Sequence, residues 1–339
     1  MRGRDLNARV WEELTEEFRA LGGVADNIRL GEGASGRGLF PIDPGRPFRL
    51  RVPENLLVST ADIMFESGVL RVGPGANAGA RECKFVEDYY AHLAWGAGGR
   101  AEIERIFEQA QALPPELRPK LASEYHCGSW FDEPTPGLIE TQFIESREFG
   151  YKGREVLMPF VDLANHGDAF AYVSDGGIAI KGTAGGEITV RYAETDTYGL
   201  FRSWGFSAES TIALSVELEG TVETSRLYIE RQTSAAKAGS QPWVPVLTRG
   251  DGAIKLSFLM LGSQKTPRLC RGIFRRVLRD AGFNDVDEAF DKVRRANLQH
   301  FLKLLADLET LEGAMVQSLR RMARCQLQAL AFCFGVHEI

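Results

Sequence analysis

Apolar side chains recur every three or four residues at both ends of the chain, a spacing that predicts amphipathic helices. At the N-terminus this pattern covers residues 5–22. Near the C-terminus it predicts three long helices, over residues 269–281, 286–311 and 311–333. We expect the second of these three to bury one apolar stripe, which consists of Leu298, Phe301, Leu302, Leu305 and Leu308.

The middle of the chain carries short apolar runs bounded by glycine and proline, a pattern typical of short β-strands. Two turns within it predict hairpins, the Asp-Gly-Gly turn at residues 175–177 and the glycine-rich turn at residues 183–186. The predicted strands are residues 28–30, 48–52, 56–59, 155–159, 169–174, 178–181, 187–192, 214–218 and 225–229.

A block from residue 60 to about residue 121 interrupts the strands with helical spacing. Its segments are residues 61–70, 85–95 and 103–113, and we interpret their aromatic side chains as core. Residues 232–241 are polar and predict an exposed loop. The chain therefore predicts an α+β fold with helices inserted among strands and helices at the end.

Composition narrows the class of protein without identifying it. The 339 residues are 44% hydrophobic and 25% charged, as in an ordinary globular protein, and the net charge of −6 argues against broad binding of nucleic acid. No apolar run has the length of a membrane helix, and residues 1–6 lack an apolar signal core, so we expect a cytoplasmic protein. Five cysteines without a CxxC pair predict reduced thiols and no structural metal site.

The basic residues that precede residue 280 are most simply a solvated helix face, and an acidic partner is the alternative. They are Arg271, Arg275, Arg276 and Arg279.

Residues 157–206 hold the densest set of candidate chemical groups. They include an Asp-Leu-Ala-Asn-His run at 162–166, a Gly-Gly-Glu turn and Tyr192. His166 could act as a general base, but no serine or cysteine nucleophile and no second metal ligand lies at a suitable spacing, so a structural histidine is the simpler interpretation. Tyr192 alone is typical of a core tyrosine. These residues predict a β-rich unit with a glycine-lined ligand site and leave the reaction open.

A glycine cluster at residues 31–38 could let a ligand approach the backbone closely, although a plain β-turn is the simpler explanation. It lacks the GxxxxGK[ST] pattern of a nucleotide-binding loop.

The order of the motifs resembles the SET-domain methyltransferases, and in particular the branch that includes the Rubisco large-subunit lysine methyltransferase. The resemblance is carried by residues 35–40 (Ser-Gly-Arg-Gly-Leu-Phe), 146–149 (Ser-Arg-Glu-Phe), 159–166 (Pro-Phe-Val-Asp-Leu-Ala-Asn-His), 185–192 (Gly-Gly-Glu-Ile-Thr-Val-Arg-Tyr) and 204–206 (Trp-Gly-Phe).

This resemblance implies a β-rich SET fold with a knot-like chain crossing, split by a helical insert and followed by a helical domain that binds the protein substrate. The implied parts are residues 1–60 as the first part of the SET domain, 61–145 as the insert, 146–212 as the core, 213–266 as a connecting segment and 267–339 as the C-terminal helical domain.

The resemblance also implies an S-adenosylmethionine-dependent protein-lysine N-methyltransferase that acts on a non-histone protein, works as a monomer and binds neither membrane nor nucleic acid. Tyr192 would be the catalytic tyrosine at the channel between methyl donor and lysine. The residues implied for the donor are Ser35, Gly36, Arg37, Gly38, Asp162, Asn165, His166, Tyr192 and Phe206, with Asp162 bracing the site. Those implied for the substrate are Ser146, Phe149, Tyr192 and Trp204.

Three positions depart from the family pattern: Ala193 replaces a glycine, Thr197 an asparagine and Trp204 a tyrosine. Trp204 removes a hydroxyl and adds bulk near the expected amine pocket, which leaves the number of methyl groups and the acceptor open. The alternatives are a histidine methyltransferase of the same fold and an inactive SET module that binds a protein partner.

Overall fold

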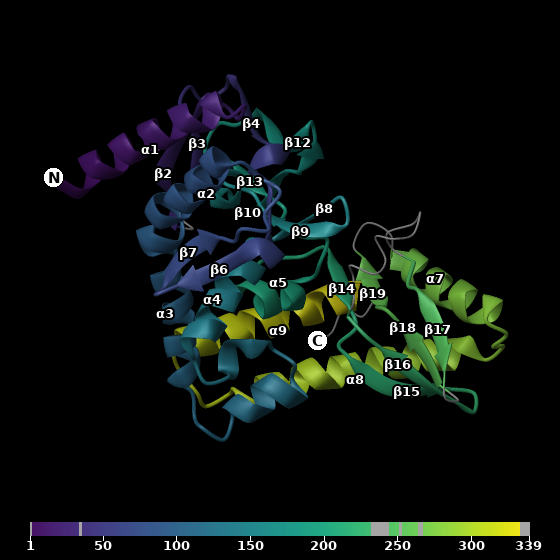
Figure 1. The fold of residues 1–339 in the computed structure, drawn as a ribbon. Helices are drawn as coiled ribbons and strands as arrows, with labels where there is room; N and C mark the ends of the chain where they lie inside the picture. Colours follow the sequence, from purple (N-terminus) through teal and green to yellow (C-terminus); the bar gives the residue numbers. More distant parts are fainter. Residues whose placement is uncertain (1, 34–35, 232–243, 251–252, 264–266, 333–339) are drawn as a thin grey trace. The chain divides into compact units, whose positions relative to one another are not determined.

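A computed structural model describes the chain as an α+β protein with many short strands and eight described helices (Figure 1). Two compact units emerge from its contacts, and the boundaries do not follow simple chain order. The described residues are 2–33, 36–231, 244–250, 253–263 and 267–332. The first unit comprises Met1–Arg105 and Pro134–Glu194, and the second comprises Ile106–Glu133 and Thr195–Ile339.

The strands of the first unit form small sheets, most of them antiparallel. In its largest sheet, one central strand buries the alternate residues Phe48, Leu50 and Val52, and the other buries the consecutive residues 177–180. The four-stranded sheet has the order β1 (Val24–Asp26), β4 (Pro47–Pro53), β12 (Gly177–Thr183) and β11 (Val173–Ser174); a three-stranded sheet has the order β5 (Val58–Ser59), β9 (Arg154–Leu157) and β8 (Phe149–Tyr151); β2 (Ile28–Gly33) pairs with β3 (Gly36–Pro41), and β6 (Ile63–Glu66) with β7 (Val69–Val72).

The helix predicted over residues 61–70 is wrong, because these residues form the β6–β7 hairpin. Glu66 pairs with Val69, so the connection has only two residues, Ser67 and Gly68. Both have positive φ, at 52° and 75°, as a tight hairpin turn of this length requires. The predicted helical insert therefore begins with a hairpin.

The hairpin predicted across residues 183–186 is also wrong, whereas the one at residues 175–177 is confirmed as the β11–β12 turn. Strand β12 already has β4 on one side and β11 on the other, so no edge is left for the following strand. Residues after the turn instead form β13 (Thr189–Val190), which pairs in parallel with β10 (Asn165–Phe170).

Helix α1 (Arg2–Ala20) and helix α2 (Ala80–Leu93) enclose an aromatic core around Phe160. Ring centroids lie 4.6 Å from Phe160 at Phe18, 5.0 Å at Trp11 and 5.2 Å at Tyr89. Phe160 has φ 70° and directly precedes the short 3₁₀ helix Val161–Leu163. This core consequently fixes the start of the Asp162–His166 run.

Two further helices belong wholly or partly to the first unit. Helix α3 (Arg100–Gln111) contains the boundary between the units. Helix α4 (Pro136–Glu145) has Thr135 as its N-cap residue, whose hydroxyl accepts a hydrogen bond from the Leu138 amide.

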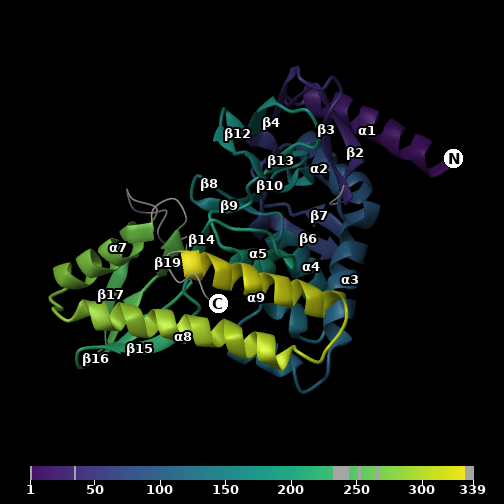
Figure 2. The same ribbon diagram turned by 180° about the vertical axis from the view of Figure 1, so that it is seen from behind.

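The second unit is not purely helical, because its strands between residues 212 and 263 form two sheets, one of which contains the predicted strand at 225–229. Helix α8 contacts β15, and helices α7 and α9 contact β19, so the C-terminal helices cover strands as well as each other. Figure 2 shows α8 and α9 side by side. The elements are α5 (Thr197–Trp204), β14 (Ile212–Leu214), β15 (Leu218–Val222), β16 (Ser225–Ile229), β17 (Leu247–Gly250), β18 (Ala253–Leu256), β19 (Met260–Ser263), α7 (Pro267–Asp280), α8 (Val286–Asp307) and α9 (Ala314–Phe332).

The apolar stripe expected on α8 is wrong at Leu302, whose exposed fraction is 48%. Leu304 is buried in its place, three residues after Phe301 and four before Leu308, both of which are buried as predicted. The loop predicted at residues 232–241 lies outside the described residues. Among the helices that the structure describes, none has both the length and the apolar character to cross a bilayer.

Candidate active site

Strand β3 lies against a carboxylate that the sequence did not single out as a site residue. A Cβ atom at Gly38 would lie 2.6 Å from Glu187 Oε1 and 2.6 Å from Asn165 Nδ2, which explains why glycine is needed there. The Ile188 amide donates a hydrogen bond of 2.7 Å to the Leu39 carbonyl and holds the Glu187 segment beside β3. The glycine cluster is thus a close-approach surface rather than only a turn.

Asn165 links three of the motifs. Its Nδ2 donates to Glu187 Oε1 at 2.6 Å and to the Arg37 carbonyl at 3.2 Å. The parallel pairing of Asn165 with Thr189 places the amide on the same edge as Glu187. Arg37 in turn donates to the Leu93 carbonyl at the end of α2. Residues far apart in the sequence therefore converge on one polar edge.

His166 and Tyr192 lie together in the first unit, as predicted. Their ring centroids are 5.2 Å apart at 73°, and the Tyr192 amide donates to His166 Nδ1 at 3.4 Å. Burial lowers the pKa of His166, which favours the neutral ring that this acceptor role requires. The Tyr192 hydroxyl donates to the Ala164 carbonyl at 3.0 Å, and burial raises its pKa, so it stays protonated.

Asp162 is braced by two neighbouring tyrosines of α2. The Tyr89 hydroxyl donates to Oδ1 and the Tyr90 hydroxyl donates to Oδ2 at 3.0 Å. Burial raises the pKa of Asp162, and the tyrosine hydrogen bonds and the charge of Arg147 oppose that rise. Both carboxylate oxygens therefore have protein donors, and the role of Asp162 in bracing the donor site stays a prediction.

Ser146 and Arg147 follow α4 and form a local polar cluster. The Ser146 hydroxyl donates to the Phe143 carbonyl at 2.9 Å and accepts from Arg147 Nη1 at 2.8 Å. The Arg147 guanidinium lies 4.1 Å from the centre of the Phe143 ring, and its charge acts on both Asp162 and Tyr192.

Phe149 packs edge-on against Tyr172, with ring centroids 4.8 Å apart. Sequence reasoning missed Tyr172. Burial raises the pKa of its hydroxyl, and the neighbouring side chains of Tyr192 and Asp162 raise it further, so the three groups lie close enough to interact electrostatically. Nothing in the local pattern of an isolated tyrosine beside a two-residue strand would have revealed this.

Trp204 and Phe206 belong to the second unit, at the end of α5. Gly205 between them closes the helix in the left-handed region, with φ 70°. Their predicted roles beside the amine and the donor stay predictions, and Ser35 lies outside the described residues.

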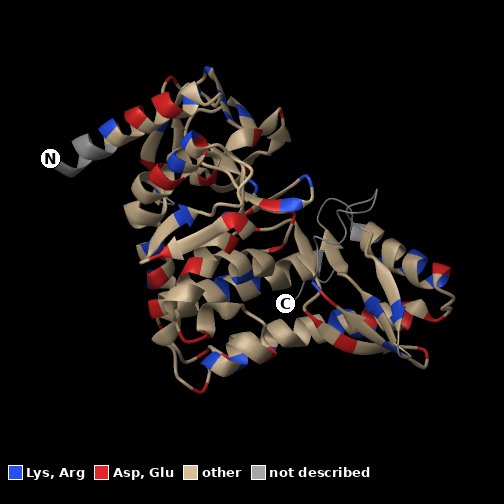
Figure 3. Ribbon diagram, in the orientation of Figure 1, with Lys and Arg blue, Asp and Glu red and all other residues tan. Residues whose placement is uncertain are grey.

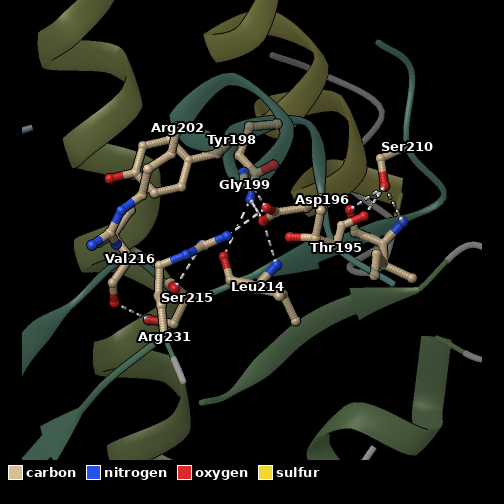
Figure 4. Close-up of polar contacts among 12 residues, drawn as sticks. Thr195, Asp196, Tyr198, Gly199, Arg202, Ser210, Leu214, Ser215, Val216 and Arg231 are labelled. Atoms are coloured by element: carbon tan, nitrogen blue, oxygen red, sulfur yellow. Dashed lines mark hydrogen bonds and ion pairs between the residues drawn. The ribbon is translucent and has the colours of Figure 1, made fainter. Parts of the chain in front are cut away.

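Helix α5 is anchored by Asp196, which has no exposed surface (Figure 4). Its carboxylate accepts hydrogen bonds from the Gly199 amide at 2.8 Å, the Leu214 amide at 2.8 Å and Gln326 Nε2 at 2.6 Å. It also pairs with Arg231 Nη2 at 2.6 Å. This network fixes the start of the helix whose last residue is Trp204.

Within the described residues, no group of three or more histidine, cysteine, aspartate or glutamate side chains could hold a metal ion.

No protein-family model matches the chain, and no curated protein matches it either. Several solved structures are similar to it over most of its length, among them the following three. One, described as "Crystal structure of the SET domain of LSMT bound to Lysine and AdoHcy", is 12% identical and covers 97% of this chain and 90% of that chain, with a TM-score of 0.44. "Structure of Rubisco LSMT bound to AdoMet" is 11% identical over 96% of this chain and 91% of that chain, with a TM-score of 0.43. "Structure of Rubisco LSMT bound to Sinefungin and Monomethyllysine" is 12% identical over the same shares, 96% and 91%, with a TM-score of 0.43. These identities and TM-scores are low, so function is argued below from the chain's own residues.

Proposed function

We propose that this chain is an S-adenosylmethionine-dependent protein-lysine N-methyltransferase with a SET fold, acting on a non-histone protein in the cytoplasm. One observation carries the proposal. In the first unit, Gly38 and Asn165 lie against Glu187, and His166, the next residue after Asn165, lies against Tyr192. The motif resemblance assigns Gly38, Asn165, His166 and Tyr192 to the donor site and the transfer channel. Without these contacts, the motifs that carry the resemblance would be only separate segments of the sequence.

The residues present fit a cationic donor with an amino-acid end. Gly36 has φ 91°, and among the described residues no atom lies within 4 Å of the place that a Cβ would take, which leaves room for a ligand beside its backbone. The Glu187 carboxylate beside Asn165 supplies the negative charge that a sulfonium or ammonium group favours. Gly36, Gly38, Asn165 and His166 would hold the donor, which, when bound, supplies a methyl group activated by the sulfonium charge.

Tyr192 orients the acceptor amine. Its hydroxyl proton is directed to the Ala164 carbonyl, which leaves oxygen lone pairs to accept a hydrogen bond from the amine. Because burial keeps this hydroxyl protonated, it aligns the amine without removing its proton. Catalysis then rests mainly on alignment of the two reactants. Before transfer the lysine ammonium must give its proton to water, a loss that a positive sulfonium charge nearby would favour.

Asp162, Ser146, Phe149 and Tyr172 form the substrate side of the proposed channel. The Phe149–Tyr172 ring pair supplies an apolar wall for the aliphatic part of a lysine, and Asp162 supplies a nearby negative charge for its ammonium form. Trp204 and Phe206 are proposed to complete the amine pocket and the adenine site.

The test combines donor binding with methyl transfer. Calorimetry should detect S-adenosylmethionine binding to the wild-type chain, and the labelled donor should transfer its methyl group to a lysate protein. Tyr192→Phe should reduce transfer by about 100-fold and leave donor affinity unchanged, because it removes one positioned group at the reacting centre. Tyr151→Phe is the matched control, since that hydroxyl bonds Glu54 instead.

Each other outcome has a defined meaning. If S-adenosylmethionine did not bind, the proposal would be wrong, and an inactive SET module that binds a protein partner would be the better explanation. Mass spectrometry that found the label on histidine would change the acceptor, and near-normal turnover in Tyr192→Phe would remove the tyrosine's assigned role.

A further inference from the structure

Helix α9 presents an exposed face that is basic and contains no acidic residue. Gln317, Arg321, Arg324 and Gln328 are exposed at spacings of four, three and four residues, so they lie on one side of the helix. With the partly buried Arg320 and Cys325 they line a hollow. Residues 314–332 include no aspartate or glutamate. We name this surface, residues 317, 320, 321, 324, 325 and 328, the α9 basic face.

Two arginines of this face, Arg321 and Arg324, are exposed, whereas Arg320 is partly buried. Arg320 is already engaged, since its Nη2 donates to the Leu308 and Glu309 carbonyls at 2.6 and 2.7 Å, at the end of α8. Across the described ranges, no carboxylate forms an ion pair with Arg321 or Arg324. Arg321 forms a side-chain hydrogen bond with Cys325. Burial raises the pKa of this thiol, the charge of Arg321 lowers it, and the charge of Glu209 raises it.

Helix α7 shows the contrasting arrangement. Its arginines pair with carboxylates of the same unit, Arg271 with Asp291 at 2.5 Å and Arg275 with Asp287 at 2.5 Å. Figure 3 shows both charge signs on α7. The basic cluster that the sequence singled out on α7 is therefore largely neutralised within the protein, whereas Arg321 and Arg324 have no carboxylate partner among the described residues.

We propose that the α9 basic face docks an acidic segment of a partner protein. From Gln317 to Gln328 the face is about 16 Å long, the length of roughly five residues of extended chain. Arginine binds carboxylates through its planar fork of donors, and the flanking glutamine amides can bond a peptide backbone. A nucleic acid fits less well, because the whole chain has a net charge of −6 and would repel an extended polyanion beyond the few arginines of this face.

The docking of an acidic segment is independent of methyl transfer, and its test is a binding measurement. A fluorescein-labelled oligoglutamate peptide is titrated with the full chain at low salt, and fluorescence anisotropy is followed. Arg321→Glu with Arg324→Glu should weaken binding by about tenfold or more, because each change turns one attraction into one repulsion. Raising the salt concentration should weaken wild-type binding as well.

The matched control is Arg276→Glu with Arg295→Glu, which changes the net charge equally on exposed positions of α7 and α8. It should keep most of the peptide affinity. The milder pair Arg321→Gln with Arg324→Gln, checked by circular dichroism, serves if the glutamate variant does not fold. Equal losses in both double variants, no peptide binding, or tighter binding of an oligonucleotide or of inorganic phosphate would each overturn the proposal.

Discussion

Asp196 offers a sharp test of how the second unit is held together. Asp196→Ala leaves Arg231 buried without its counterion; that guanidinium side chain has an exposed fraction of only 5%. The change also removes the acceptor for the Gly199 and Leu214 amides and for Gln326. Breaking one side of a buried ion pair costs about 3–5 kcal/mol. That is a large part of the roughly 5–15 kcal/mol that stabilises a typical domain.

Urea denaturation followed by circular dichroism measures this loss as a change in the free energy of unfolding. Asp88→Ala is the control, because Asp88 forms only an exposed helical pair with Lys84 and should cost about 0.5 kcal/mol. Asp196→Ala combined with Arg231→Met should recover part of the loss, since no charge is then buried alone. A loss below about 1 kcal/mol for Asp196→Ala, or one no larger than the control's, would refute the idea that this network anchors α5.

Two further predictions concern pH. Replacing both Tyr89 and Tyr90 by phenylalanine removes the hydrogen bonds that stabilise the Asp162 carboxylate, so the pKa of Asp162 should rise. The acid limb of the pH–rate profile should then move to higher pH. An unchanged acid limb would show that the protonation of Asp162 does not affect the reaction. Burial lowers the pKa of His300 from 6.5 to about 4, so the unfolded chain binds a proton first as pH falls, and stability should decline between pH 6.5 and 4. His300→Gln should flatten that decline by up to about 3 kcal/mol in denaturation at several pH values, and an equally steep decline would contradict it.

Helices with long, regular apolar spacing were predictable, and short elements were not. The periods over residues 5–22 and 286–311 correspond to α1 and α8, because one buried face dictates their pattern. Residues 61–70 contain apolar side chains that also fit a helix, and only the Ser67–Gly68 turn distinguishes a hairpin. The two sheets of the second unit were only partly predicted, because strands β17, β18 and β19 have only four residues each and so carry a short pattern.

The candidate site was predictable where motifs carried it and unpredictable where distant segments met. Asn165, His166 and Tyr192 were expected together and lie together. The hydroxyl of Tyr89 donates a hydrogen bond to Asp162, which lies 73 residues away in the sequence. The ring of Tyr172 packs against the ring of Phe149, which belongs to a different part of the sequence. Such partners follow from how segments pack, which local spacing does not encode.

Helix α2 has a consequence for protein engineering. It is fastened to the motif region at both oxygens of Asp162, through Tyr89 and Tyr90, and at its own last carbonyl, through Arg37. Helix α2 therefore cannot be replaced by another helix without loss of these contacts. A transplant that brought a different helix to this position would leave a carboxylate without donors and free the strand that carries Gly36 and Gly38. Any chimera must inherit the two tyrosines together with the helix.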